Sequence, residues 1–206
     1  MKVLMINGSP KEHGCTYTAL SEIGNTLVEN GVEYEIFWVG AKPITGCLGC
    51  GACRTKGECV HNDTVNDAAK KLDAADGIIV GSPVHYAAAS GAVTSFMDRL
   101  FYSAGAKLKL KPGTAVVSCR RGGSTAAIDQ LNKYFLINQM PIVSGTYWNM
   151  VHGSTPDEVK QDLEGMQNMR NIGRNMAWLL KSIKEGAENG VEPPIPESPV
   201  KTNFIR

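Results

Sequence analysis

Residues 1–16 read MKVLMINGSPKEHGCT, an apolar run followed by small and polar residues. The apolar part, Val3 to Ile6, is closed by Gly8-Ser9-Pro10, which predicts a short strand buried on both faces. Residues 16–28 then predict a helix, because apolar residues recur there at helical spacing: Ala19, Leu20, Ile23, Leu27 and Val28. A buried strand that leads through a small-residue turn directly into a helix is the first unit expected of an α/β protein.

The chain repeats this alternation of strand and helix. Residues 32–38 alternate in polarity and favour a second strand, and Asp63 can cap a helix that runs to about residue 73. Residues 77–81 and 113–118 are apolar enough for two further buried strands, and Ile142-Val143 is a weak candidate for a fifth. We therefore expect an α/β fold, a doubly wound five-stranded parallel sheet in a three-layer α/β/α arrangement.

The C-terminal part of the chain predicts one long helix and a tail. Residues from Pro156 to about Lys184 carry a methionine-rich apolar stripe, which favours packing in the core or against another subunit. Residues from Glu185 onward contain four prolines, namely Pro193, Pro194, Pro196 and Pro199, and are expected to be extended. The predicted organisation is one domain over residues 1–184, with a cysteine-rich loop at 47–59, and a tail over residues 185–206.

Length and composition restrict the class of protein further. A chain of 206 residues suits one domain, and a net charge of +1 lacks the basic footprint of a nucleic-acid or anionic-lipid partner. Because no apolar run approaches the roughly 18 residues of a membrane span, we expect no membrane partner and a cytoplasmic location. In that compartment the six cysteines are expected to be thiols, metal ligands or redox groups rather than structural disulfides.

The loop after the first strand is a candidate phosphate site, because ligands of such sheets bind beyond the carboxyl ends of the strands. Its small residues let backbone amides and the helix N-terminus face one anion, and its hydroxyls add donors. The sequence has no Gly-x-Gly-x-x-Gly, and the loop is one residue too long for a nucleoside-triphosphate loop, which leaves a terminal monophosphate. A turn that merely starts a helix is the alternative. The residues assigned to this site are Ser9, Lys11, Gly14, Cys15, Thr16 and Thr18.

Two further loops are candidates for the rest of a ligand. The loop after the third strand is uncharged and carries an aromatic side chain, so a flat aromatic ligand suits it; a packed tyrosine is the alternative. The loop after the fourth strand pairs arginines with glycines and suits the edge of a flavin, which becomes negative on reduction; a solvated charged turn is the alternative. The assigned residues are Pro83, Val84, His85, Tyr86 and Ala87 in the first loop, and Ser118, Arg120, Arg121, Gly122 and Gly123 in the second.

Four cysteines are spaced closely after the second strand, at Cys47, Cys50, Cys53 and Cys59. Four thiols in one glycine-rich loop can surround a single metal centre, and sulfur ligands favour a [4Fe–4S] cluster or tetrahedral zinc. The compact run is closer to ferredoxin spacing than to the two separated pairs of most zinc sites. Empty thiols, or a reversible disulfide between two of them, are the alternatives.

The three loops and several later segments resemble the flavodoxin-like NAD(P)H-dependent FMN reductases, in particular the branch that contains the iron–sulfur flavoproteins. The resemblance spans nearly the whole chain. It rests on Gly8-Ser9-Pro10 through Thr16, Ser82-Pro83-Val84-His85-Tyr86, Phe96-Met97-Asp98-Arg99, Arg120-Arg121-Gly122-Gly123, Tyr147-Trp148-Asn149, Glu164-Gly165-Met166-Gln167 and Thr202-Asn203-Phe204-Ile205-Arg206. One departure is His85, which stands where the family often has a second tyrosine.

The resemblance implies that the first loop holds the FMN phosphate and the other two hold the isoalloxazine. It also implies that NADH or NADPH is the electron donor and that the four cysteines hold a [4Fe–4S] cluster. The expected function is an FMN-dependent oxidoreductase that reduces a flavin, quinone, azo or nitro compound. The alternatives are an electron carrier that relays electrons between redox proteins, and a zinc-stabilised nucleotide-binding module.

A homodimer or homotetramer is expected from the segments that have no obvious place within one doubly wound domain. These are the cysteine loop, Tyr147-Trp148-Asn149 and the proline-rich tail, which suits an arm lying across a neighbouring subunit near the flavin. A frayed tail on a monomer is the alternative.

Overall fold

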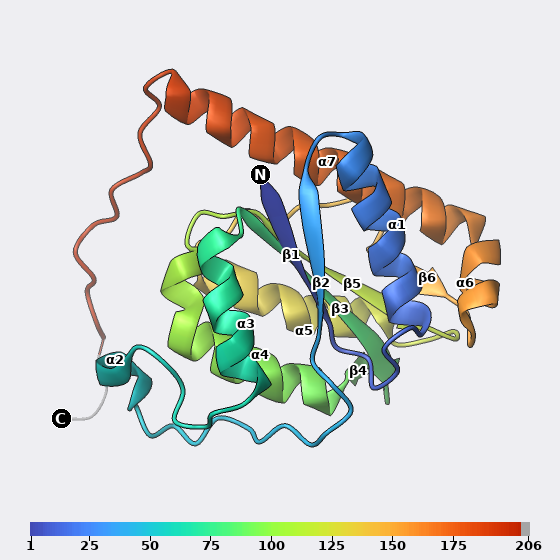
Figure 1. The fold of residues 1–206 in the computed structure, drawn as a ribbon, viewed down its shortest axis with the longest axis horizontal. Coiled ribbons are helices and arrows are strands. Elements are labelled where there is room, and N and C mark those ends of the chain that lie inside the picture. Colours follow the sequence, from blue (N-terminus) through green and yellow to red (C-terminus); the bar gives the residue numbers. More distant parts are fainter. Residues whose placement is uncertain (203–206) are drawn as a thin grey trace.

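Five parallel strands form the centre of the computed structural model, which describes residues 1–202. The strands lie in the order β2-β1-β3-β5-β6 (Figure 1). Their bounds are Lys2–Asn7 for β1, Glu33–Trp38 for β2, Gly77–His85 for β3, Gly113–Cys119 for β5 and Met150–His152 for β6. The strand order reverses between β1 and β3, as it does in flavodoxin-like folds, so the doubly wound five-stranded parallel sheet is confirmed.

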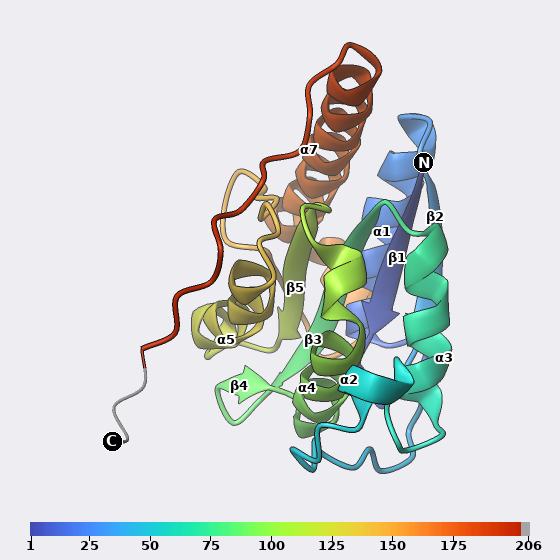
Figure 2. The ribbon, with the colours of Figure 1, turned by 90° about the vertical axis from the view of Figure 1, so that its left-hand side faces the viewer.

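Helices cover both faces of the sheet and complete the three layers (Figures 1 and 2). One face packs against α1 (Cys15–Glu29), α6 (Pro156–Gln161) and α7 (Leu163–Glu188). The other face packs against α3 (Thr64–Lys71), α4 (Gly91–Ala104) and α5 (Ser124–Ile137). The short helix α2 (Cys53–Lys56) lies in the cysteine loop, and the 3₁₀ turns Leu72–Ala74 and Gly105–Leu108 follow α3 and α4.

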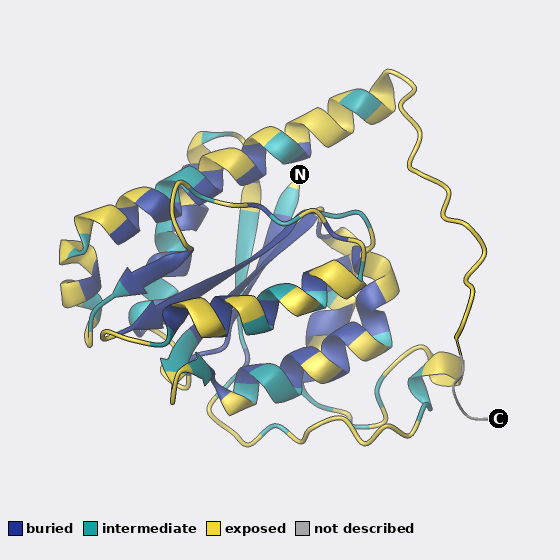
Figure 3. Cartoon of the chain, turned by 180° about the vertical axis from the view of Figure 1, so that it is seen from behind, coloured by how far each residue is buried: buried dark blue, intermediate teal, exposed yellow. Residues whose placement is uncertain are grey.

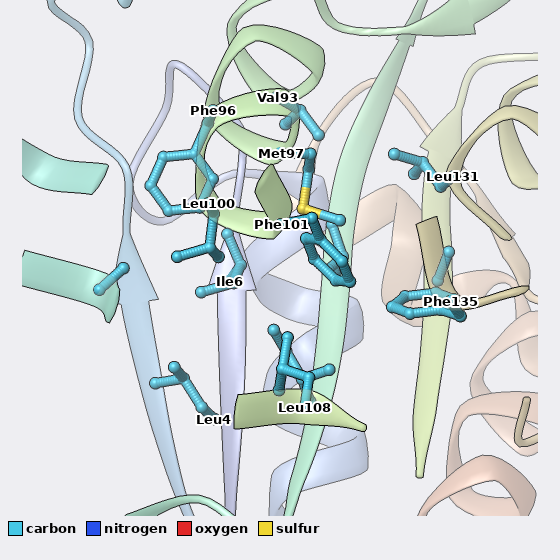
Figure 4. Close-up of a cluster of buried hydrophobic side chains, with 14 of the residues drawn as sticks. Leu4, Ile6, Val93, Phe96, Met97, Leu100, Phe101, Leu108, Leu131 and Phe135 are labelled. Atoms are coloured by element: carbon cyan, nitrogen blue, oxygen red, sulfur yellow. The ribbon is translucent and has the colours of Figure 1, made fainter. Parts of the chain in front are cut away.

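The core is apolar on both sides of the sheet. The central strands and the inward helix faces are buried, whereas the outward helix faces are exposed and the edge strand β2 is only partly buried (Figure 3). Figure 4 shows Phe96 and Leu100 of α4 beside Ile6 of β1, with Phe135 of α5 in the same cluster. These four side chains are fully buried, which fixes the helices firmly against the strands whose ends carry the candidate site.

The fifth strand is not the one that the sequence predicts. Ile142 makes only an isolated bridge to Gly113, and the strand at this edge of the sheet is instead β6. The β6 segment is three residues long and shows no usable alternation, so tertiary pairing with β5 creates it rather than local propensity.

The third strand is also longer than predicted. It continues past Gly81 to His85 and pairs with the antiparallel β4 (Ala88–Ala89), so Pro83, Val84 and His85 belong to a strand rather than to a loop. Tyr86 and Ala87 form the turn between them, with φ of 50° and 60°. Two consecutive left-handed residues are typical of a tight hairpin turn, but these positions usually carry Asn or Gly, which explains why the sequence conceals it.

The predicted last helix is divided at Asp162, which caps α7 by accepting a hydrogen bond from the Gly165 amide. Its apolar stripe faces the core, since Met169 and Met176 are fully buried. The helix also continues to Glu188, so the expectation of an extended chain from Glu185 was wrong for its first residues. Prolines prevent helix only from Pro193 onward, and the exposed, extended tail begins after Gly190 (Figures 1 and 3).

Candidate functional site

A cleft of about 330 Å³ lies at the carboxyl edge of the sheet, where the strand order reverses. The ends of β1, β3, β5 and β6 all contribute to its wall. Of the predicted residues, the cleft brings together Ser9, Lys11, Gly14, Cys15, Thr16, Pro83, Val84, His85, Ser118 and Arg120. The predicted residues outside its lining are Thr18, Tyr86, Ala87, Arg121, Gly122 and Gly123.

The loop between β1 and α1 is held in place by two side chains that the sequence analysis missed. The Asn7 amide is fully buried; its oxygen accepts from the Ser9 amide at 3.2 Å, and its nitrogen donates to the Glu12 carbonyl at 2.7 Å. The Trp38 indole N–H, at the end of β2, donates to the Ser9 carbonyl at 2.8 Å. Both residues look like ordinary strand ends in the sequence, and only the parallel pairing of β1 with β2 brings them together.

The start of α1 has the properties of an anion site. Gly14 is its N-cap residue, and since glycine has no side chain it leaves the first amide groups of the helix without a side-chain acceptor. The amides and the helix dipole both favour a negative group at this end. Lys11 and Ser9 line the same part of the cleft. A terminal phosphate therefore fits these residues.

Two hydroxyls meet at the floor of the cleft. Thr16 Oγ1 and Ser118 Oγ lie 2.9 Å apart and both are buried, so the helix that follows β1 and the end of β5 are joined by one hydrogen bond. Thr18 does not share this place. Its hydroxyl donates to the Gly14 carbonyl and its side chain lines a separate groove with His13 and Tyr17.

The β3–β4 hairpin forms the second wall. Pro83, Val84 and His85 line the cleft, whereas the Tyr86 ring points away from the protein and is fully exposed. Gly123 supports the hairpin rather than the cleft, because a Cβ at this position would lie 2.5 Å from the Ala87 Cα, and its φ of 89° is left-handed. The hairpin thus presents an uncharged, largely apolar surface.

The lining of the cleft also includes four consecutive residues, Gly153, Ser154, Thr155 and Pro156. These residues follow β6, the strand that the sequence pattern does not predict, so no sequence signal marked them as site residues. Arg120 reaches the cleft from the end of β5, and Arg121 does not. Burial raises the pKa of both the Cys15 and the Cys119 thiol, so neither is an activated nucleophile.

The four predicted cysteine ligands line one smaller cavity, together with Arg99 and Tyr102 of α4. The loop is tightly folded, since Gly49, Gly51 and Gly57 all have positive φ. Within residues 1–202, however, no three His, Cys, Asp or Glu side chains are gathered in a way that could hold a metal ion. The thiols share a cavity, and their sulfurs would have to draw closer to chelate one centre.

An ion pair that the sequence analysis did not identify lies beneath this loop. The Arg99 guanidinium makes two hydrogen bonds to the Asp63 carboxylate, at 2.7 and 2.8 Å, and its side chain is fully buried. Burial alone would raise the pKa of Asp63, but the hydrogen bonds from Arg99 and the Val65 amide, with the positive charge, lower it overall. The bond with Asp63 in turn raises the pKa of Arg99, so the pair stays ionised.

The fold and the cleft define a flavodoxin-like protein whose ligand site is built from the strand ends at the switch point. The chain belongs to the NADPH-dependent FMN reductase family, whose model matches residues 1–155. Membership in this family makes it a flavin-dependent oxidoreductase.

Individual relatives agree with this assignment. An iron–sulfur flavoprotein of Methanocaldococcus jannaschii is 35% identical over 193 residues, which cover 90% of this chain and 100% of the relative. An iron–sulfur flavoprotein of Methanosarcina thermophila is 27% identical over 192 residues, which cover 91% of this chain and 100% of the relative.

Solved structures show the same fold. RosB with a bound riboflavin-phosphate intermediate superposes with a TM-score of 0.70 at 14% identity, over 100% of this chain and 94% of its own. A WrbA-like flavodoxin from Agrobacterium tumefaciens superposes with a TM-score of 0.62 at 16% identity, over 88% of this chain and 98% of its own. None of the helices within residues 1–202 combines the length and the apolar character needed to cross a membrane.

Proposed function

We propose that this protein is an FMN-dependent oxidoreductase that passes electrons from NADH or NADPH to a flavin, quinone, azo or nitro acceptor. The observation that carries the proposal is the cleft at the switch point, where the anion site at the start of α1 and the uncharged β3–β4 hairpin line one cavity. FMN has the matching shape, a phosphate at one end and a flat ring system at the other.

Bound FMN would supply the hydride and electron chemistry, and the side chains of the chain would bind and orient it. Ser9, Lys11 and Thr16, with the first amides of α1, would hold the phosphate. The hairpin would cover the ring and exclude water from it, and Arg120 would provide a positive charge at its edge. In this scheme no protein side chain acts as nucleophile or acid, which agrees with the burial that raises the pKa of the Cys15 and Cys119 thiols.

The proposal is tested by titrating the purified chain with FMN and then following NADH and NADPH oxidation with each class of acceptor. We expect one FMN per chain and steady turnover with at least one small acceptor. FMN binding without turnover on any small acceptor would favour the electron carrier, and a chain that binds no FMN would contradict both readings.

Replacing Thr16 with Ala is expected to weaken FMN binding by about 1–2 kcal/mol, roughly tenfold, since a hydrogen bond to a charged group is lost. Isothermal titration or quenching of flavin fluorescence measures the dissociation constant. Thr18→Ala is the matched control, because Thr18 lies on the same helix but in the neighbouring groove. Equal affinities in the Thr16 variant and the wild type would exclude Thr16 from the phosphate site.

Replacing Arg120 with Ala is expected to lower the reduction potential of bound FMN, because a positive partner of the reduced ring is removed. If the variant stabilises the reduced flavin, relative to the oxidised flavin, by about 1.4 kcal/mol less, the two-electron potential falls by roughly 30 mV. Arg121→Ala is the control, since Arg121 does not line the cleft, and it should change the potential much less. A spectroscopic redox titration that gives the wild-type potential for the Arg120 variant would contradict this role.

A second function, an iron–sulfur flavoprotein electron carrier, is favoured by the shared cavity of Cys47, Cys50, Cys53 and Cys59. Four thiols at compact spacing fit a [4Fe–4S] cluster better than the separated pairs of a zinc site. The relatives named iron–sulfur flavoproteins support this reading. Anaerobic reconstitution with iron and sulfide tests it: iron and sulfide at four per chain are expected, and bound zinc without iron would favour the nucleotide-binding module.

We further propose that the protein assembles as a homodimer or homotetramer in which the tail contacts a neighbouring subunit. The described tail carries apolar side chains that its own domain does not cover, with Ile195 at 95% and Val200 at 94% exposure. The proposed arm extends to Arg206, and its last residues, 203–206, lie outside the described residues.

Deleting the residues after Glu192 is expected to reduce the mass of the oligomer or to weaken FMN binding, because the arm would no longer bridge two subunits. Multi-angle light scattering with a parallel FMN titration measures both. A point variant that keeps the length, Ile195→Ser, separates the loss of an apolar contact from the loss of the chain. A full-length monomer would exclude the assembly altogether.

A further inference from the structure

Arg99 makes an unusually complete set of contacts for a buried side chain. Its Nε–H donates to the Cys59 sulfur at 3.2 Å. Its two terminal nitrogens each donate to the Asp63 carboxylate and to one backbone carbonyl, that of Thr45 or of His61, both at 3.3 Å. An arginine has five N–H donors, and this geometry occupies all of them.

These partners lie on both sides of the cysteine loop. Thr45 precedes the first cysteine, whereas Cys59, His61 and Asp63 lie at and beyond the last one. One rigid guanidinium on α4 therefore fixes where the loop leaves the domain and where it returns, and the exposed segment between them carries Cys47 and Cys50. A charge that is fully removed from water is costly, so this arrangement persists only because each donor is matched.

The hydrogen bond to the Cys59 sulfur is not needed to hold the two ends of the loop together. Asp63 already neutralises the guanidinium, and the two carbonyls already join the ends of the loop. Hydrogen bonds to ligand sulfurs are among the features that set the potential of an iron–sulfur centre, because they stabilise negative charge on the sulfur. The fork of an arginine can reach sulfur, carboxylate and carbonyls together, and a lysine ammonium cannot.

We propose that Arg99 is the positioning residue of the four-cysteine site: it anchors both ends of the loop and donates a hydrogen bond to the Cys59 sulfur that favours the reduced state of the centre. The inference rests on the proposed [4Fe–4S] function. Arg99 acts on the centre through its hydrogen bond to the Cys59 sulfur.

The experiment compares Arg99→Lys with Arg54→Lys. Arg54 is a matched control because it is a second guanidinium of the same loop, bonded to the Tyr102 hydroxyl at 2.8 Å, with no described contact to a cysteine sulfur. Each variant is reconstituted anaerobically, its cluster potential is measured by redox titration, and hydrogen exchange over residues 45–63 is measured in the metal-free chain.

Arg99→Lys keeps the charge and loses the bond to sulfur, so we expect the equilibrium constant for cluster reduction to fall at least tenfold, which is 59 mV for one electron. Amides of residues 45–63 should also exchange faster in Arg99→Lys, while its FMN affinity should stay like that of wild type. Arg54→Lys should keep the wild-type cluster potential and the wild-type exchange rates. An unchanged potential in a fully loaded Arg99→Lys overturns the inference and leaves the iron–sulfur proposal standing.

A wild-type chain that takes up no iron or sulfide overturns the iron–sulfur proposal, and the inference about Arg99 fails with it. If Arg99→Lys does not fold, Arg99→Gln combined with Asp63→Asn removes both charges together and leaves none unpaired in the interior. The same fall in potential is expected of that double variant, and its absence would equally overturn the inference.

Discussion

Gly8→Ala is expected to lower the free energy of unfolding by about 3 kcal/mol and to weaken FMN binding more than tenfold. A Cβ at this position would lie 1.7 Å from Val93 Cγ2 and 2.9 Å from the Gly81 carbonyl oxygen. Val93 is fully buried and β-branched, so it cannot turn aside, and the loop must shift instead. A shift of the loop moves Ser9 and Gly14, which would hold the phosphate.

Urea denaturation gives the stability and FMN titration gives the affinity. Gly91→Ala is the matched control, because no described atom lies within 4 Å of a Cβ there, and it should leave both quantities close to wild type. Adding Val93→Ala to Gly8→Ala should recover part of the affinity by making room for the new methyl group. A Gly8→Ala protein as stable as wild type would show that β1 and α4 do not approach as described.

Asp63→Ala is expected to lower the free energy of unfolding by about 3 kcal/mol, because it leaves the buried Arg99 guanidinium without its carboxylate. We place the effect at the lower end of the usual range for a broken buried pair, since the Asp63 side chain is 35% exposed. Asp67→Ala is the control: its ion pair with Lys70 is solvent-exposed, and its loss should cost well under 1 kcal/mol.

The difference in unfolding free energy between wild type and Asp63→Ala should become smaller as the pH falls. The pKa of Asp63 is lowered in the folded protein, so the carboxylate stabilises the fold fully above its ordinary pKa of about 3.9. That contribution is lost as the pH falls through the lowered folded-state pKa. The gap in unfolding free energy should therefore be constant near neutrality and narrow below about pH 4, and a gap that widens in acid would contradict the assignment.

The sequence predicts those parts of the fold that local patterns control. The apolar runs that became β1, β3 and β5 are uninterrupted and have a glycine at or near one end, so their apolar character alone identifies them. The β6 strand has only three residues, and its His152 amide donates a hydrogen bond to the side chain of Asp162, outside the strand. Patterns in a short window cannot reveal such an element.

The same distinction holds for the candidate site. Hydroxyls and glycines in the loop after β1 are visible in the sequence because their chemistry is local. Arg99 is not, because a charged residue within a helix ordinarily lies in solvent, and its burial follows from a loop more than thirty positions earlier folding over α4. Trp38 likewise acts through its indole N–H on a loop of a neighbouring strand.

The bond between Thr16 and Ser118 has a consequence for how the two ends of a ligand communicate. Either hydroxyl can donate in this pair. Each hydroxyl has one O–H donor. If the Thr16 hydroxyl donates its hydrogen bond to a phosphate, it can only accept a hydrogen bond from the Ser118 hydroxyl. Occupation of the anion end would then set the polarity of the pair and turn the Ser118 proton away from the ring end. The Ser118 hydroxyl, at the end of β5, would then present an acceptor lone pair to the flavin. Binding of the phosphate at the other end of the cleft would determine this orientation.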